Sequence, residues 1–255
     1  MIRSARTICA LALALAGGSF NFGTFPAAFA QEPAPSAPPA VLAGAAQLNI
    51  APLRVEIDST NSAATLRLTN SSQRALPVQT RLFAWRQEAG EDVYAPSSAL
   101  SISPSIISIQ PGQTQIVRLL RSGAASPGEK RFRLAVDQLP DPSLARSGQA
   151  EARLRFTIPV FLDRDSASPT QLAWRISQDR IEAINSGGAT ARILTIEAKT
   201  ASGQAIAVQR NSLRYIQGNS TIAWPITNGC ALGPVTITAQ IDGQTANVQA
   251  SPNCG

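Results

Sequence analysis

AEARLRFTIPVF, residues 150–161, decides how this chain is interpreted, because its side chains alternate in character as they do along a β-strand. The two rows are Ala152, Leu154, Phe156 and Ile158 on one face, and Glu151, Arg153, Arg155 and Thr157 on the other. A strand with one apolar row and one largely charged row can offer its side chains and its backbone edge to another chain.

Short strand patterns cut by turn residues fill residues 47–163 around this stretch. The expected strands are Leu53–Ile57, Ala64–Asn70, Pro77–Trp85, Gln113–Arg121, Arg131–Leu139 and Glu151–Leu162. Turn formers such as Asn70-Ser71-Ser72 and Pro111-Gly112 separate them. Six or seven strands in about 115 residues are typical of one immunoglobulin-like β-sandwich.

A second series of strand patterns follows in residues 164–255. Its members are Leu172–Ser177, Arg180–Asn185, Ala191–Ala198, Ala205–Gln209, Ser220–Pro225, Val235–Ile241 and Thr245–Ala250. Asp242-Gly243 between the last two is a hairpin signal. The sequence therefore predicts an all-β protein with two immunoglobulin-like sandwich domains, 47–163 and 164–255.

The N-terminal segment has the pattern of an export signal. Arg3 and Arg6 precede an apolar run, and Ala28-Phe29-Ala30 provides small residues where a signal peptidase cleaves. The apolar run is about half of the roughly 20 residues that a membrane-spanning helix needs. We expect residues 1–30 to be a signal peptide cleaved after Ala30, residues 31–46 to be a disordered Pro/Ala-rich leader, and the mature protein to have no membrane insertion.

The charge of the mature chain is modest and comes mostly from arginine. The precursor has 22 Lys and Arg against 16 Asp and Glu, and loss of Arg3 and Arg6 leaves 20 basic residues. Lys130 and Lys199 are the only lysines. Arginine suits paired hydrogen bonds to carboxylates, and dispersed charge on an exported protein disfavours nucleic acid as a partner.

Two cysteines, Cys230 and Cys254, remain after removal of the signal. An isolated pair in an oxidising compartment usually forms a disulfide. Closing a loop of this length would stabilise the fold by about 3 kcal/mol. A metal site or a reactive thiol is the alternative, but no histidine and no CxxC motif supports either.

Catalysis is disfavoured because the chain has no histidine. This absence removes the commonest general base and most zinc sites. Glu88, Glu91 and Asp92 cluster beside Gly90, where a solvated hairpin tip explains them better than a glycosidase pair. Neither lysine lies in a Ser-x-x-Lys motif. We therefore expect no enzyme activity, cofactor or metal.

An ordered set of motifs resembles the periplasmic pilus-assembly chaperones of the chaperone-usher pathway, which have two immunoglobulin-like domains. The motifs are Leu53-Arg54-Val55, Leu66-Arg67-Leu68-Thr69-Asn70-Ser71, Ser101-Ile102-Ser103-Pro104, Ile109-Gln110-Pro111-Gly112-Gln113-Thr114-Gln115-Ile116-Val117-Arg118, Glu129-Lys130-Arg131-Phe132-Arg133-Leu134 and Ile158-Pro159-Val160-Phe161. The likeness is good over about 115 residues and looser in the second domain. The Ile-Pro-Val-Phe ending is closest to the archaic branch, which includes chaperones for spore-coat-U-like subunits.

The resemblance implies that the opening stretch is a donor strand, lent to a pilus subunit that lacks its last strand. Ala152, Leu154, Phe156 and Ile158 would then fill the subunit's groove. The alternative is that this row packs in the chain's own core.

The resemblance also implies that the two domains are arranged around a cleft, where the family anchors the subunit's C-terminal carboxylate with two cations. Arg54 matches the first. The second position falls on Ile158 when aligned from the Val-Phe end, and on Arg155 or Thr157 when counted by strand face. We choose Arg155, with Arg153 as a weaker candidate. Arg118 also matches a family position and is interpreted as structural.

The expected function is that of a periplasmic chaperone that stabilises pilus or surface-fibre subunits and delivers them to an outer-membrane usher. The partners would be the subunit and the usher, with no nucleic acid. The alternative is a structural or adhesive fibre component, which would need an N-terminal extension of alternating hydrophobic residues, and residues 31–46 carry Pro and Ala instead.

Overall fold

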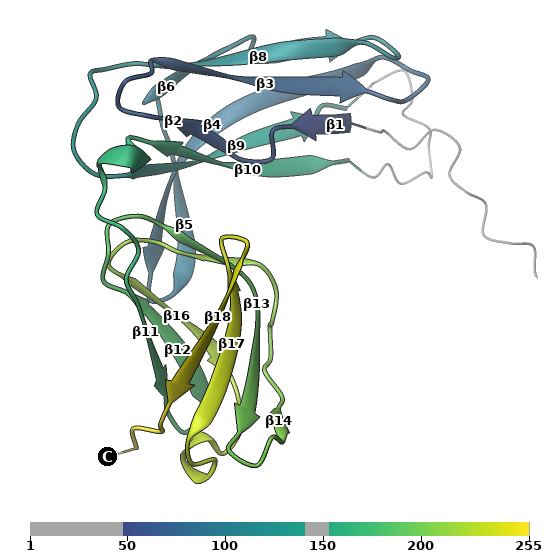
Figure 1. The fold of residues 1–255 in the computed structure, drawn as a ribbon. Coiled ribbons are helices and arrows are strands. Elements are labelled where there is room, and N and C mark those ends of the chain that lie inside the picture. The colour runs from purple at the N-terminus through teal and green to yellow at the C-terminus, as the bar shows by residue number, and fades with distance from the viewer. Residues whose placement is uncertain (1–47, 141–152, 255) are drawn as a thin grey trace, which may run out of the picture. The chain divides into compact units, whose positions relative to one another are not determined.

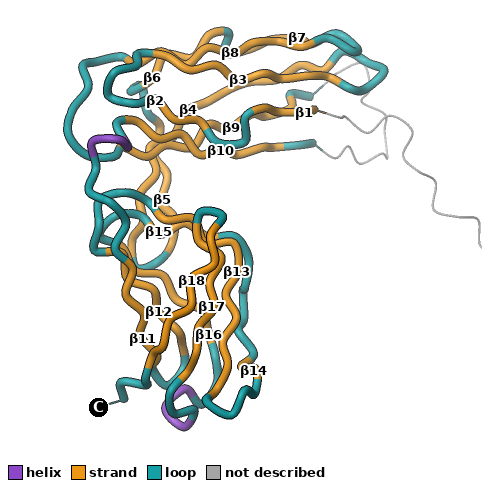
Figure 2. The backbone as a smooth tube through the Cα atoms, in the orientation of Figure 1, coloured by secondary structure: helices purple, strands orange, loops and turns teal. Residues whose placement is uncertain are grey.

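The computed structural model describes residues 48–140 and 153–254, so the expected signal, the leader and Ala152 lie outside the described residues. Figure 1 and Figure 2 show strands throughout, together with two short 3-10 turns, Arg164–Ser166 and Gly229–Ala231. The predicted all-β fold of two immunoglobulin-like sandwiches is confirmed. No helix in the described ranges is long and apolar enough to cross a membrane.

The first domain contains two sheets. One has the strand order β1 (Leu48–Ala51), β3 (Ala63–Asn70), β8 (Thr114–Arg121) and β6 (Leu100–Ser103). The other has the order β2 (Val55–Ile57), β10 (Arg155–Leu162), β9 (Lys130–Gln138), β4 (Leu76–Glu88) and β5 (Glu91–Pro96), and β7 (Ile106–Ile109) also pairs with β4.

The core of the first domain follows from the alternation along these strands. Every second residue faces inward, so aliphatic side chains from both sheets pack together and exclude water. The buried cluster includes Leu66, Leu68, Val117, Leu119, Leu134, Val136, Ile158 and Val160. Polar side chains occupy most of the positions between them, as in an antiparallel sheet with one solvated face.

The second domain is a smaller sandwich with a separate core. Its three-stranded sheet is β11 (Leu172–Ile176), β12 (Arg180–Asn185) and β16 (Ser220–Pro225). The five-stranded sheet is β14 (Ala205–Ile206), β13 (Ala191–Thr200), β17 (Val235–Ile241) and β18 (Gln244–Ala250), with β15 (Arg214–Ile216) also paired to β13. Trp224 is fully buried in the core, and the ring of Trp174 stacks on it at 5.8 Å.

The predicted disulfide between Cys230 and Cys254 is confirmed, with the two Cα atoms 5.9 Å apart. It joins the 3-10 turn before β17 to the segment after β18. A disulfide that closes a loop of this length restricts the unfolded chain more than the folded one, and therefore stabilises the fold.

The opening strand differs from the sequence expectation. The pattern predicts one strand over 53–57, but Leu53 and Arg54 lie in a bend between β1 and β2, and β2 begins at Val55. Pro52 explains the break, because it has no N–H to donate to a sheet. Arg54 is therefore placed by the turn before β2 rather than by the regular alternation of a strand.

A buried polar contact joins residues of the two domains. The Glu129 carboxylate accepts a hydrogen bond from the Thr190 backbone N–H at 3.0 Å, and it also accepts one from the Thr190 hydroxyl. Arg131 and Arg164 form ion pairs with the same carboxylate. Since a buried carboxylate needs several donors to offset its lost hydration, this arrangement fixes the connection between the domains.

Candidate functional site

Half of β10 has a free edge within the described residues. On one side, β10 pairs with antiparallel β9 along its whole length, from Arg155 opposite Asp137 to Leu162 opposite Lys130. On the other side, parallel β2 pairs only with Val160–Leu162. No described strand pairs with that side of residues 155–159, whose backbone groups can accept another strand.

The apolar row of β10 changes from exposed to buried along the strand. Leu154 precedes β10 and is 39% exposed. Phe156 is half-buried against the core of the first domain. Ile158 lies inside that core and is 2% exposed. For Ile158 the structure therefore favours the alternative that its side chain packs in the chain's own core, whereas Leu154 remains accessible.

The second predicted cation, Arg155, lies on the opposite face and has a partner there. Its guanidinium donates a hydrogen bond to the Asp137 carboxylate, which also accepts one from Arg81 Nη2 at 2.6 Å. Burial raises the pKa of Asp137, but the hydrogen bonds from Arg155 and Arg81 outweigh it and hold this pKa below its ordinary value. Arg155 is thus committed to a charged cluster on the sheet.

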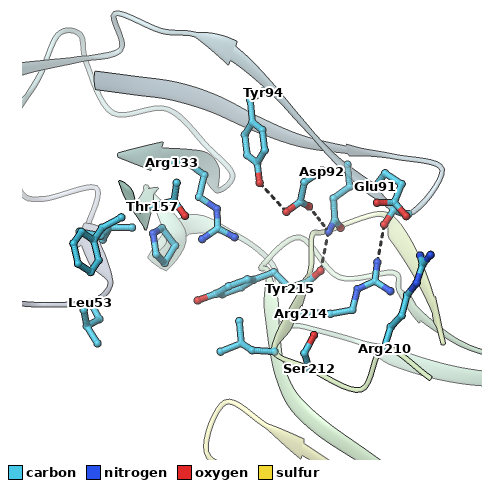
Figure 3. A pocket seen from close by; sticks show the side chains of 16 residues that line it. Leu53, Glu91, Asp92, Tyr94, Arg133, Thr157, Arg210, Ser212, Arg214 and Tyr215 are labelled. Carbon is cyan, nitrogen blue, oxygen red and sulfur yellow. Dashed lines mark hydrogen bonds between the residues drawn. The ribbon is translucent and has the colours of Figure 1, made fainter. Parts of the chain in front are cut away.

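A cavity of about 870 Å³ lies where the free edge of β10 ends. Residues 156–159 of β10 line it, together with Leu53, the β4–β5 hairpin and Arg133 of β9. The second domain contributes residues 210 and 212–215. Neither Arg155 nor Arg153 lines this cavity. Figure 3 shows the charged and aromatic side chains that surround it.

Arg133 is one of three arginines that line the cavity, with Arg210 and Arg214 of the second domain, and it is the one that comes from the sheet containing β10. It lies opposite Pro159 on β9, and its guanidinium carbon is 3.8 Å from the centre of the Trp85 ring and 4.9 Å from that of Tyr215. Its Nε is buried and donates to no described atom. Arginine held flat against aromatic rings keeps its N–H groups fixed in orientation, which suits recognition of a carboxylate.

Tyr94 and Asp92 form the wall beside Arg133. The Tyr94 hydroxyl donates to Asp92 Oδ2 at 3.0 Å, and Figure 3 shows this bond. Burial and the nearby Asp92 carboxylate raise the pKa of Tyr94, while the Arg133 guanidinium acts in the opposite direction. The phenol therefore stays protonated at neutral pH and orients the Asp92 carboxylate.

Contacts from the β4–β5 hairpin hold the second-domain wall in place. Gln87 Nε2 donates to the Tyr215 carbonyl at 2.8 Å, and the Gln217 N–H donates to Gln87 Oε1 at 3.0 Å. Arg214 Nη2 donates to the Gly90 carbonyl at 3.0 Å. These bonds keep the Tyr215 ring edge-on to Trp85 at 5.2 Å, so the aromatic support of Arg133 is formed before any partner arrives.

Arg54, the first predicted cation, lies beside the cavity and has partners of its own. It forms an ion pair with Glu56, approaches Asp242 Oδ1 to 3.6 Å, and lies 4.8 Å from the centre of the Phe161 ring. Its side chain is 25% exposed. Arg54 itself does not line the cavity, but the preceding residue, Leu53, does.

The strand pattern pairs Arg54 with Arg155 as the two cations and puts Phe156 and Ile158 on the other face, and it does not single out Arg133. The motif containing Arg133 was visible as alternating basic and apolar residues from Lys130 to Leu134. The missing information was the pairing register, which puts Arg133 opposite Pro159 at the end of the free edge. Pro159 occupies the face on which the cation was sought, and the neighbouring strand supplies the charge.

Comparisons with known proteins agree with this architecture. Residues 47–166 match the family model of the pili and flagellar-assembly chaperones, PapD N-terminal domain. Residues 47–166 therefore belong to this domain family of pilus-assembly chaperones. No curated protein sequence matches it significantly.

Solved structures show the same two-domain fold. A chain of the CsuC–CsuE chaperone–tip adhesion subunit complex from archaic Csu pili of Acinetobacter baumannii has 20% sequence identity and a TM-score of 0.64, covering 81% of this chain and 99% of its own length. The E. coli chaperone DraB has 19% sequence identity and a TM-score of 0.58, covering 82% of this chain and 97% of its own length. A chain of the Salmonella enterica SafA pilin–SafB chaperone complex has 15% sequence identity and a TM-score of 0.58, covering 80% of this chain and 96% of its own length.

Proposed function

We propose that this protein is a periplasmic chaperone that stabilises a pilus or surface-fibre subunit by donor-strand complementation and delivers it to an outer-membrane usher. The observation that carries the proposal is the free edge of β10 at residues 155–159, which leads into the cavity that holds Arg133. Strand addition needs an unpaired edge, and an anchor at its end sets the register.

The position of β2 supports one direction for the incoming strand. β2 runs parallel to β10 and occupies the same edge further along, starting at Val55. A subunit strand in line with β2 and parallel to β10 would end beside Leu53, Arg54 and the cavity. An antiparallel strand would bring an N-terminus there, and an ammonium group would meet arginines. The parallel direction is therefore the one that the charges favour.

Leu154 and Phe156 are the side chains that we propose to enter the subunit's groove. Leu154 is exposed and Phe156 is only half-buried, so both can gain burial in a complex. Ala152 remains a proposed groove filler outside the described residues. Ile158 is already buried and has little area left to gain, so we assign it to the chaperone's own core.

We further propose that Arg133 is the principal anchor of the subunit's C-terminal carboxylate and that Arg54 assists at its edge. Arg133 points its fixed guanidinium into the cavity, whereas Arg155 binds Asp137. A hydrogen bond to the carboxylate would give the buried Nε–H of Arg133 the acceptor that it lacks within the described residues.

We place cleavage of the signal after Ala30, which delivers the mature chain to the periplasm. Strand exchange between the chaperone and a subunit needs no nucleotide, metal or covalent step. The usher, as the second partner, and the assignment to the archaic branch rest on the resemblance of the motifs. The cavity has no histidine, and its arginines can bind a partner. Both features are consistent with a chaperone that binds its partner without catalysis.

Replacing Leu154 with glutamate should reduce recovery of a co-expressed subunit about tenfold, because a carboxylate would have to enter an apolar groove. The measurement is the amount of soluble 1:1 complex obtained with a pilus subunit encoded beside the chaperone gene. The wild-type chain should yield that complex and should not polymerise when purified alone.

Ile106→Glu is the matched control, since Ile106 is also an exposed aliphatic residue but lies on β7, away from β10. This variant should keep wild-type recovery of the complex. Equal recovery with Leu154→Glu and Ile106→Glu would contradict the donor role of Leu154. Polymerisation of the purified chain would instead support a fibre component.

A further inference from the structure

Exposed hydrophobic side chains gather around the cavity. Leu53 is 71% exposed, the largest value among the large hydrophobic residues of the described ranges, and Leu213 is 49% exposed. Both line the cavity, one from each domain. Single exposed leucines are common, but two that line one cavity form a surface that a ligand can cover.

The fold brings Leu53 to the end of the free edge. Leu53 lies in the bend before β2, and β2 starts its pairing with β10 at Val55 opposite Val160. A strand added to residues 155–159 therefore ends beside Leu53. The last residue of that strand is the one whose side chain would reach it.

Leu213 is held near the cavity by its neighbours. Arg214 donates to the carbonyl of Gly90 at 3.0 Å and to that of Ala223 at 2.7 Å, and Tyr215 is buried against Trp85. Two fixed residues directly after Leu213 limit where its side chain can move. The exposed leucine is consequently part of a prepared surface rather than of a long free loop.

We propose that Leu53 and Leu213 select a partner whose C-terminal residue has an apolar side chain. The inference rests on the proposed function and adds a second specificity element to it. The carboxylate and the side chain of a last residue leave the same Cα, so an anchor at Arg133 fixes where that side chain lies. Leu53 and Leu213 offer an apolar side chain burial, and a polar side chain held against these two leucines would lose hydration in exchange for an apolar contact.

The test uses full-length chaperone and dye-labelled decapeptides of alternating valine and threonine that end in leucine, serine or lysine, each with a free or an amidated C-terminus. Fluorescence anisotropy gives the affinities. The free-acid leucine peptide should bind about tenfold more tightly than the serine and lysine peptides. Leu213→Ser should remove most of this preference, while Leu120→Ser, which alters an exposed leucine of β8 outside the cavity, should keep it.

The selection by the two leucines and the carboxylate anchor are tested by different comparisons of peptides. Equal affinity for the three free-acid peptides would overturn the selection by Leu53 and Leu213, while a preference for free acid over amide would leave the carboxylate anchor intact. Equal affinity for acid and amide forms would contradict the anchor itself. A leucine preference that survives in both Leu213→Ser and Leu53→Ser would also overturn the proposed selection.

Discussion

Replacing Arg133 with methionine should weaken binding of a subunit by roughly 100-fold, because loss of a paired charge-assisted hydrogen bond to a desolvated carboxylate costs about 2–5 kcal/mol. Methionine keeps an unbranched stem that can still cover Trp85 and Tyr215. The variant should therefore fold normally. The whole effect should appear as a weaker affinity for a co-purified subunit, measured by competition.

Arg155→Met is the matched control, because it also replaces an arginine, on the neighbouring strand. Arg155 is bound to Asp137 and lies outside the cavity. Its effect on affinity should be less than about threefold, as for an exposed ion pair. If Arg155→Met weakened the complex more than Arg133→Met did, the second anchor would be Arg155 as the sequence pattern first indicates, and the assignment to Arg133 would be wrong.

Asp163→Asn should lower the stability of the chaperone by about 3–5 kcal/mol, because breaking a buried ion pair leaves a buried charge without compensation. Asp163 is fully buried directly after β10. Its carboxylate accepts hydrogen bonds from Arg121 Nη1 at 2.6 Å and from Lys130 Nζ at 2.8 Å. The side chain of Arg121 is 7% exposed. Thermal unfolding should show a decrease of roughly 10 °C in the midpoint.

The effect of Asp163→Asn should depend on pH in a defined direction. Burial raises the pKa of Asp163, but hydrogen bonds from Lys130, the Ser126 N–H and Arg121 outweigh it, so the folded-state pKa is lowered. The stabilisation is then present above the unfolded pKa, about 3.9, and is lost as the pH falls through the lower folded value. The difference in midpoint should shrink below about pH 4.

Asp179→Asn provides the comparison for Asp163, since Asp179 pairs with Arg180 on the exposed surface. No measurable change in the unfolding midpoint is expected for this control. A midpoint for Asp163→Asn that matches that of Asp179→Asn would contradict the structural role of the buried carboxylate.

Much of the fold could be predicted from the sequence because the strands alternate clearly between turn residues. The ranges Arg180–Asn185, Ser220–Pro225 and Val235–Ile241 agree with the structure at both ends. The strands β1, β5, β6, β7 and β15 are absent from the predicted set, since segments of three to six residues of mixed character carry little periodicity. The disulfide could be predicted because Cys230 and Cys254 are the two cysteines that remain once the expected signal, with Cys9, is removed.

The site was harder to predict because its parts come from strands whose register the sequence does not show. Alternation put Arg155 on the charged face of the donor strand, but its partner Asp137 lies on β9. Alternation likewise grouped Ile158 with Leu154, although the first is buried in the core and the second is exposed. The aromatic support of Arg133 by Tyr215 depends on a contact between domains, which no local pattern reports.

Amide hydrogen exchange along residues 153–158 would show whether β10 lends its free edge to a subunit strand. In the free chaperone, the amides of β10 that do not pair with β9 should exchange quickly, because no described strand covers that edge. In the complex with a subunit, these amides should become strongly protected while those of β8 stay unchanged. A stable complex in which residues 153–158 exchange as fast as in the free protein would contradict donor-strand complementation by this chain.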